Sequence, residues 1–116
     1  MNPLTQKKCT PCEGVDKPLT SQEINEKLKL VSGWNASSDD KMINREWTTK
    51  NFMTAIEFIH KIAQLAEAEG HHPDIHLSNY RRLRIDLSTH AIGGLSENDF
   101  ILAAKINELP VELKKN

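Results

Sequence analysis

The fold is decided by residues 51–89, NFMTAIEFIHKIAQLAEAEGHHPDIHLSNYRRLRIDLST, where one long helical pattern runs directly into two strand patterns. In its first half, apolar residues recur every three or four positions, as in a helix that turns one face to a core. Gly70 stands where the C-terminal glycine of such a helix is expected. The predicted core-facing stripe comprises Phe52, Ala55, Ile56, Ile59, Ile62, Ala63 and Ala66.

Two segments with alternating apolar residues follow this helix, DIHLSN at 74–79 and LRIDLST at 83–89. Alternation is the pattern of a half-buried strand, and matching the two apolar faces sets the register of a hairpin. The register that results pairs Ile75 with Leu87 and Leu77 with Ile85.

This register places residues 80–82 at the turn and sets His72 opposite His90 at the open end of the hairpin. Two histidines that are distant in the sequence are therefore expected to meet. Four of the five histidines of the chain lie between positions 71 and 90, so the sequence predicts one cluster of imidazoles there.

The sequence before this centre predicts a helix and a strand pair. Residues 21–30 form a short helix, with Thr20–Ser21 at its cap and Gly33 at its end. Trp34 opens a short strand, and MINREWT at 42–48 alternates well enough for a second one.

The sequence after the centre predicts a third helix that ends at Pro110. Ser96 and Asp99 have the spacing of a capping box, and the expected apolar side consists of Ile101, Leu102, Ile106 and Leu109. The order is then α-β-β-α-β-β-α. We predict an α+β fold, with a four-stranded antiparallel sheet and three helices packed on one of its faces.

Composition limits the class of protein. A chain of 116 residues supports one domain, which we place at 20–116, after a flexible N-terminal arm at 1–19. A formal charge of −1 argues against nucleic acid as a partner, and three arginines near the hairpin turn favour solvent or intersubunit contacts. No apolar run is long enough for a membrane span or a signal peptide, so we expect a cytoplasmic location.

Both cysteines lie in the predicted arm, as Cys9-Thr-Pro-Cys12. A C-x-x-C pair is compatible with redox chemistry or with half of a zinc site, but no second pair completes a tetrahedral set. We interpret them as two thiols outside both the core and the site.

The histidines allow three interpretations. A zinc site would use His72 and His76, but Pro73 opposes the helix that gives this spacing its meaning, and no metal is predicted. Scattered surface imidazoles are the second alternative, which we apply to His76, near Asp86, and to His60 on the helix flank. Acid–base chemistry is the third, because imidazole titrates near neutrality and one ring gives a proton while another takes one.

The combined motifs resemble one known family. Glu67-x-x-x-His71-His72-Pro73, then Tyr80, His90 and Asp99, together with segments such as LKLVSGW and LSTHAIGGLSENDFILAAKI, resemble the pterin-4a-carbinolamine dehydratases from about Thr20 to Leu109. The resemblance implies loss of water from 4a-hydroxytetrahydropterin to give quinonoid dihydropterin, in the recycling of tetrahydropterin for an aromatic amino-acid hydroxylase. It implies no metal and no organic cofactor.

The resemblance also implies roles for individual residues. His71 and His90 would be the acid–base pair, and His72 would bind and orient the pterin. Glu67 is either a solvated helix residue or the partner of an imidazole, and Asp99 is either a capping residue or part of the site. The remaining predicted contacts to the substrate are Pro73, Thr89, Ala91 and Ile92.

Two expectations concern partners. Family members form oligomers, so we expect a homo-dimer or a homo-tetramer. Members also act as dimerisation partners of a transcription factor, which makes a protein-binding module the alternative function. An exposed edge strand and the long helix would be the surfaces for such contacts.

Overall fold

The computed structural model of the chain describes residues 2–10 and 17–115. The predicted order α-β-β-α-β-β-α is confirmed. In chain order, the elements are η1 Pro3–Gln6, α1 Ser21–Leu28, β1 Asn35–Ala36, β2 Ile43–Thr48, α2 Phe52–Glu69, β3 Asp74–Ser78, β4 Arg82–Leu87, η2 His90–Ile92 and α3 Glu97–Asn107.

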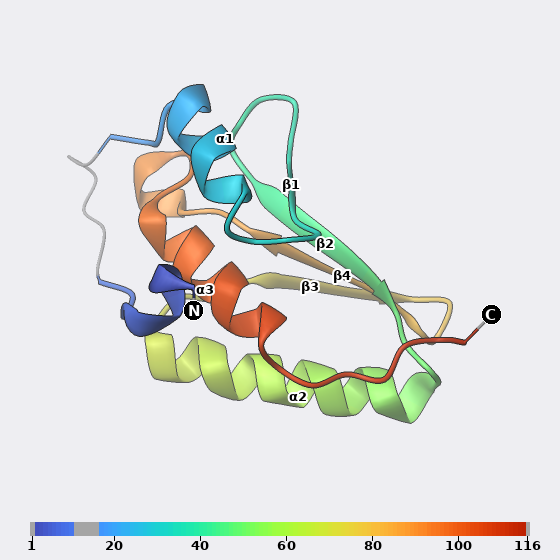
Figure 1. Cartoon of the computed structure of the whole chain (residues 1–116). Helices are drawn as coiled ribbons and strands as arrows, with labels where there is room; N and C mark the ends of the chain where they lie inside the picture. The colour runs from blue at the N-terminus through green and yellow to red at the C-terminus, as the bar shows by residue number, and fades with distance from the viewer. Residues whose placement is uncertain (1, 11–16, 116) are drawn as a thin grey trace.

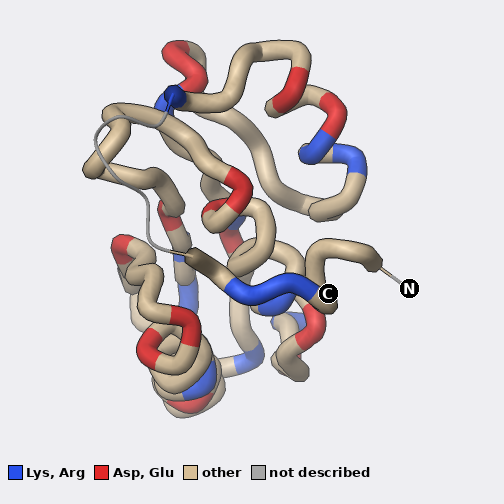
Figure 2. Tube along the Cα trace, turned by 90° about the vertical axis from the view of Figure 1, so that its left-hand side faces the viewer, with Lys and Arg blue, Asp and Glu red and all other residues tan. Residues whose placement is uncertain are grey.

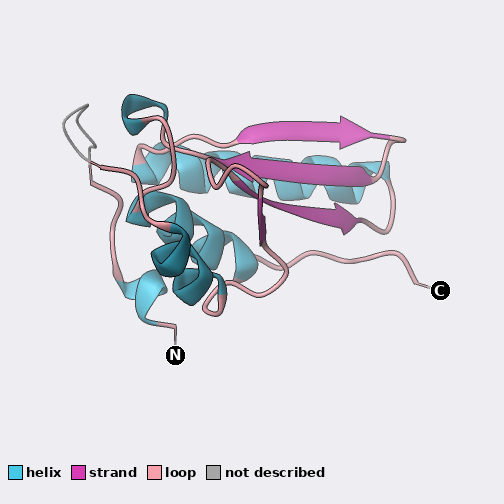
Figure 3. Cartoon of the chain, turned by 90° about the horizontal axis from the view of Figure 1, so that it is seen from above, coloured by secondary structure: helices cyan, strands magenta, loops and turns pink. Residues whose placement is uncertain are grey.

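The four strands form one antiparallel sheet in the order β1-β2-β4-β3. The helices lie on one side of this sheet, as predicted, and α2 runs along the strands (Figure 1, Figure 3). The side chains of Ile43, Trp47, Leu83 and Ile85 point to the helices and are buried, because alternate residues of a strand face the same side. The opposite face of the sheet is polar.

The predicted register of the hairpin is wrong by two residues. Ile75 pairs with Ile85 and Leu77 with Leu83, rather than with Leu87 and Ile85. A shift of two residues keeps every side chain on its predicted face, so the apolar pattern alone does not detect it. The pairing also ends at Asp74, so His72 and His90 are not opposed across strands.

The turn explains the difference. Three residues, Asn79, Tyr80 and Arg81, lie between the paired residues Ser78 and Arg82, and Asn79 and Tyr80 both have positive φ, +47° and +54°. The strand therefore resumes at Arg82, because the three-residue turn lies one position earlier than the predicted turn at 80–82. Asparagine adopts this conformation readily, but tyrosine rarely does, so the sequence gives a weak turn signal.

Helix α2 presents a narrower buried stripe than predicted. Its fully buried residues are Ala55, Phe58, Ile62 and Ala66, and the Phe58 ring packs edge-on against Trp47 at 5.3 Å. Phe52 and Ile56, both placed in the stripe by the sequence, are 47% and 39% exposed, and Ala63 is exposed too. The helix thus keeps an apolar flank at the surface, to which Met53 also belongs.

Helix α3 is the central element of the fold. It is buried on nearly all sides because η1, α2 and the sheet surround it (Figure 1). The predicted capping box is present: Ser96 accepts from the N–H of Asp99, and the Asp99 carboxylate accepts from the N–H of Ser96. Its buried residues are Asn98, Asp99, Phe100, Ile101, Leu102, Ala103, Ala104 and Ile106.

The first residues of the chain pack against the domain. Leu4 is 2% exposed and belongs to the main core cluster, and Cys9 packs against that cluster. Cys9 therefore departs from the expectation of a thiol outside the core, whereas Cys12 lies outside the described residues. Flexibility of the segment 1–19 stays a prediction.

Charged residues of both signs are spread over the chain. Basic and acidic positions are interspersed along the trace (Figure 2), in agreement with the net charge of −1. In the described part of the chain, no helix is both long enough and apolar enough to cross a membrane.

Candidate functional site

Three chain turns meet at one end of the molecule. Gly70 ends α2 in the left-handed conformation (φ +68°), and the next N–H, of His71, donates to the Ala66 carbonyl at 3.2 Å. After β4, η2 likewise ends in a left-handed glycine, Gly93, and a hydrogen bond of 2.8 Å from Thr89 N–H to Gly94 O closes the loop. The loop leads directly into the cap of α3. The end of α2, the segment after β4 and the start of α3 therefore converge.

A pocket of about 380 Å³ lies where these segments converge. Its volume is within the range of roughly 300–1,000 Å³ that is usual for small-molecule sites. The lining residues are Thr10, Gly70, His71, His72, Ser88, Thr89, His90, Ala91 and Asn98. The structure thus brings all three predicted histidines to one pocket, even though the register from which their proximity was inferred is wrong.

His71 is held by a buried carboxylate. Its Nε2 lies 2.6 Å from Asp99 Oδ1, and the two side chains are 13% and 0% exposed. A carboxylate only accepts hydrogen bonds, so Nε2 is the protonated nitrogen of the ring. Nδ1 is consequently the nitrogen of the neutral imidazole that is able to accept a proton.

Asp99 itself is fixed by two further donors. Its Oδ2 accepts from the Thr89 hydroxyl at 2.8 Å and from the Ser96 N–H at 2.9 Å, and the Thr89 and Ser96 hydroxyls lie 2.8 Å apart. The sequence left open whether Asp99 is a capping residue or part of the site. In the structure one of its oxygens caps α3, while the other holds His71, which lines the pocket.

Glu67 pairs with His72 and not with His71. Its Oε2 contacts His72 Nε2, and both side chains are largely exposed. An exposed pair of this kind contributes little to stability, but it orients the His72 ring at the rim of the pocket. Four residues that were predicted to contact the substrate do not line the pocket: Glu67, Asp99, Pro73 and Ile92. Of these, Glu67 pairs with His72 and Asp99 pairs with His71, and both histidines line the pocket.

His90 opens η2 and is exposed. Within residues 2–10 and 17–115, its ring makes no hydrogen bond to another protein group. His90 also borders a second hollow of about 350 Å³, which shares Ser88 and Thr89 with the first. The ring is therefore accessible to a ligand and to solvent.

The two remaining histidines lie elsewhere. His76 is on the polar face of the sheet, where its Nε2 lies 2.9 Å from Asp86 Oδ2, as the sequence predicted from their expected proximity. His60 is exposed on α2. Neither lines the histidine pocket.

The pocket has three polar members that sequence reasoning missed: Thr10, Ser88 and Asn98. Ser88 precedes Thr89 in the predicted loop and follows from its position. Asn98 lies within the predicted capping box, but nothing in the pattern indicates that its side chain reaches the pocket. Thr10 belongs to the segment that was placed outside the domain.

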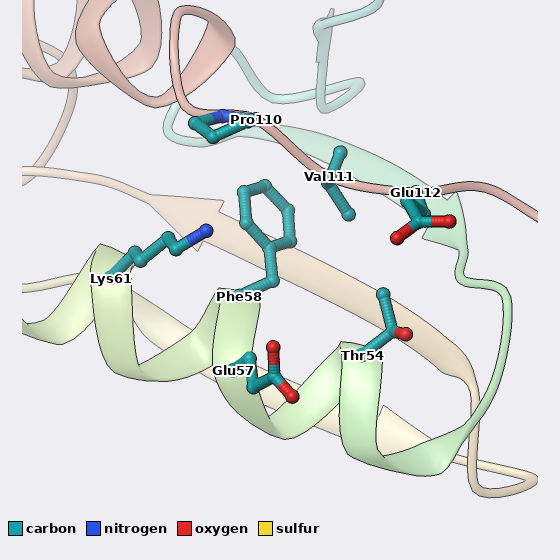
Figure 4. Close-up of a pocket in the computed structure, with 7 residues that line it drawn as sticks. All are labelled: Thr54, Glu57, Phe58, Lys61, Pro110, Val111 and Glu112. Carbon is teal, nitrogen blue, oxygen red and sulfur yellow. The ribbon is translucent and has the colours of Figure 1, made fainter.

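A separate hollow of about 240 Å³ lies between α2 and the chain after α3. Figure 4 shows Phe58 and Val111 at its centre, with the charged ends of Glu57, Lys61 and Glu112 around it. No histidine lines this hollow, and it has no counterpart of the hydrogen-bonded pair of His71 and Asp99. Among the described residues, no three His, Cys, Asp or Glu side chains are grouped closely enough to hold a metal ion.

Comparison with known proteins identifies the family of this chain. A family profile described as Pterin 4 alpha carbinolamine dehydratase matches residues 17–109. The chain belongs to the pterin 4 alpha carbinolamine dehydratase family. The resemblance noted in the sequence is thereby confirmed.

Two relatives illustrate the extent of this match. The mitochondrial pterin-4-alpha-carbinolamine dehydratase 2 of Arabidopsis thaliana is 47% identical over 112 residues, which cover 94% of this chain and 60% of that longer protein. A Methylococcus capsulatus protein that carries the same family name is 45% identical over 109 residues and is covered to 95%. The family match thus includes bacterial chains of similar length.

Solved structures agree with the fold. A Brucella melitensis protein described as a transcriptional coactivator/pterin dehydratase superposes with a TM-score of 0.74 at 35% identity, over 78% of this chain and 96% of that one. A pterin dehydratase-like protein described as a RuBisCO assembly factor in the alpha-carboxysome superposes with a TM-score of 0.56 at 21% identity. At that identity, the second likeness concerns the fold alone.

Proposed function

We propose that this protein removes water from 4a-hydroxytetrahydropterin to give quinonoid dihydropterin, by acid–base catalysis with histidines. Membership of the pterin 4 alpha carbinolamine dehydratase family supports this proposal. The observation that carries it is the pocket that gathers His71, His72 and His90, with His71 hydrogen-bonded to the buried carboxylate of Asp99.

His71 is the proposed base. The Asp99 carboxylate keeps the proton of the ring on Nε2, so Nδ1 is free to accept the proton from the ring nitrogen next to the hydroxyl-bearing carbon. Loss of that proton leaves an electron pair that forms the carbon–nitrogen double bond of the product. The carboxylate also stabilises the imidazolium that results.

His90 is the proposed acid. Its proton converts the hydroxyl of the substrate to water, so the carbon–oxygen bond breaks as the carbon–nitrogen bond becomes double. The proton taken by His71 and the proton given by His90 balance, and exchange with solvent resets both rings. The exposure of His90 suits this exchange.

His72 is assigned to binding. Its pairing with Glu67 fixes the ring at the rim, where it can hydrogen-bond a polar edge of the pterin in substrate and transition state alike. Thr89 and Ala91 also line the pocket, whereas Pro73 and Ile92, which directly follow His72 and Ala91 in the chain, do not. The chemistry needs no metal and no organic cofactor.

The test of this function is a direct assay. Freshly generated 4a-hydroxytetrahydropterin is mixed with purified protein, and the formation of quinonoid dihydropterin is followed by its absorbance, with and without a chelator. We expect acceleration over the spontaneous reaction that the chelator does not reduce. An unchanged spontaneous rate at micromolar protein would refute the proposed function.

A second candidate function is protein binding on the same scaffold. Strand β3 is an open edge of the sheet, and α2 exposes Phe52, Met53 and Ile56. Exposed strand edges and apolar helix flanks are typical contact surfaces. We therefore propose a homo-dimer or homo-tetramer, and regard a coactivator-like partner as the alternative.

The proposed site of action is the cytoplasm, where tetrahydropterin-dependent hydroxylation of aromatic amino acids would supply the substrate. The longer Arabidopsis relative is named as mitochondrial. Fractionation of cells that express the tagged full chain would separate the two locations.

A further inference from the structure

The N-terminal segment is clamped to the start of α3 by one buried side chain. Asn98 is 6% exposed, and its Oδ1 accepts the N–H of Thr10 at 3.0 Å while its Nδ2 donates to the carbonyl of the same residue. The amide thus pairs with both backbone groups of Thr10, as a neighbouring strand would. Such two-point pairing fixes both the position and the orientation of the Thr10 backbone.

The residues before Thr10 have anchors of their own. The N–H of Cys9 donates to Glu69 Oε1 at 2.9 Å, and Glu69 Oε2 accepts from Lys105 Nζ at 2.7 Å. The Cys9 thiol lies 3.6 Å from the carbonyl of Asn98. The end of α2 and the start of α3, which carry His71 and Asp99, therefore also hold the segment.

This docking brings Thr10 to the histidine pocket. Thr10 and Asn98 line it together with His71, His72 and His90, although Thr10 lies 88 positions before Asn98. The family profile begins at residue 17, so Thr10 lies outside the matched residues, whereas Asn98 lies within them. Asn98 is the direct chain neighbour of Asp99, so the clamp and the partner of His71 share one helical turn.

We infer that the docked residue Thr10 is a wall of the pterin-binding site that contacts the substrate, and that Asn98 is the positioning residue that holds it there. This inference rests on the proposed function. None of the segment's groups takes part in proton transfer, so it contributes to binding in the ground state and the transition state equally. Its loss changes KM and leaves kcat almost unaltered.

Three variants of the full chain test this wall. Asn98→Ala removes both hydrogen bonds to the Thr10 backbone, and we expect KM to rise about tenfold with kcat within about twofold. Thr10→Trp places bulk at the pocket with the clamp intact, and we expect KM to rise by a similar factor. Lys8→Ala is the matched control, because its exposed side chain lies on the same segment and lines a neighbouring groove instead; its KM should stay within about twofold.

Two further measurements separate binding from folding. Affinity for a stable dihydropterin, followed by fluorescence quenching, should fall in parallel with the rise in KM. Hydrogen exchange of the Thr10 amide should be slow in the wild type and fast in Asn98→Ala. If Asn98→Ala does not fold, Thr10→Trp still tests the inference, because the Thr10 side chain is exposed and its replacement leaves the core intact.

The possible outcomes are distinct. A wild type that neither binds nor converts the pterin overturns the proposed function, and with it this inference. An active wild type whose KM is unchanged in both Asn98→Ala and Thr10→Trp overturns this inference alone. A fall in kcat and in melting temperature of Asn98→Ala at constant KM would also overturn this inference, because Asn98 would then be a purely structural residue.

Discussion

Nε2 of His71 and Oδ1 of Asp99 lie 2.6 Å apart, although the two residues are 28 positions apart and belong to different helix ends. The second oxygen of Asp99 caps α3, so the orientation of the imidazole is tied to the start of that helix. One carboxylate therefore serves both the fold and the site.

Replacement of Asp99 separates these two tasks. Asp99→Asn keeps an oxygen that can cap α3 but removes the charge that fixes the tautomer of His71. We expect kcat for dehydration to fall about 10- to 100-fold, the usual cost of losing a partner that orients a functional histidine, while the melting temperature changes little. Asp99→Ala should in addition destabilise the fold by about 1 kcal/mol or more, because the cap is lost. Equal activity of Asp99→Asn and wild type would show that His71 needs no such partner.

The three histidines of the pocket are expected to affect different kinetic parameters. His71→Ala and His90→Ala should each lower kcat by roughly 10²-fold, because each ring is proposed to transfer a proton in the transition state. The double variant should lose far more than either alone. His72→Ala should raise KM more than it lowers kcat, since it binds substrate and transition state alike. Steady-state kinetics on freshly generated carbinolamine measure all of these.

His76→Ala and His60→Ala are the controls for this series. Both side chains lie outside the pocket, so their kcat and KM should match those of the wild type. A crippled His76→Ala with an active His90→Ala would contradict the assignment of the site.

The sequence predicted the local parts of this architecture well. Ser96 and Asp99 form the expected capping box, and Gly70 ends α2 as expected, because caps depend on residues within one helical turn. The register of the hairpin failed, since apolar faces fix only whether the shift is even or odd. The turn at residues 79–81 sets the register, and it holds a tyrosine in the positive-φ conformation that glycine or asparagine usually adopts.

The candidate site was also predictable only in part, because it depends on contacts between residues that are distant in the sequence. His71, His72 and His90 stood out as a cluster, but the choice of partner depends on tertiary geometry. Glu67 lies one turn before His71 and yet pairs with His72, while the distant Asp99 takes His71. Thr10 lies in a segment with no helical or strand pattern, so no sequence signal indicates that it reaches the pocket.

Acid should loosen the N-terminal anchor through Glu69. Burial by itself raises the pKa of this carboxyl, but hydrogen bonds from the Cys9 N–H and from Lys105 outweigh it, so the pKa lies below its ordinary value of 4.5. A depressed pKa stabilises the fold fully above pH 4.5, and this contribution is lost as the pH falls through the folded-state pKa. The melting temperature of Glu69→Gln should therefore lie below that of the wild type at pH 7, and the gap should close in acid. A gap that is independent of pH would contradict this linkage.

The thiol of Cys9 should be unreactive. Burial, followed by repulsion from Glu69, raises its pKa to about 12, so almost none of it is thiolate at pH 8. In a Cys12→Ser variant, we expect alkylation by iodoacetamide to be slower than that of a free thiol by a factor on the order of 10³, from thiolate fraction alone. Glu69→Gln in the same background should speed the reaction. Labelling at the rate of free cysteine would show that the segment is not docked in solution.

Self-association should depend on the surfaces that the fold leaves uncovered. The apolar flank of α2 exposes 47% of Phe52 and 59% of Met53, and the β3 edge exposes 37% of Ile75. An open strand edge is a template for pairing with another chain, and most soluble homo-oligomers are symmetric. We expect light scattering at micromolar concentration to give a dimer or tetramer of the 13.2 kDa chain. Met53→Lys and Ile75→Lys should each reduce the mass, whereas Lys41→Glu in an exposed loop should not. A wild-type mass equal to one chain would refute the proposed oligomer, and an unchanged mass in both surface variants would place the interface elsewhere.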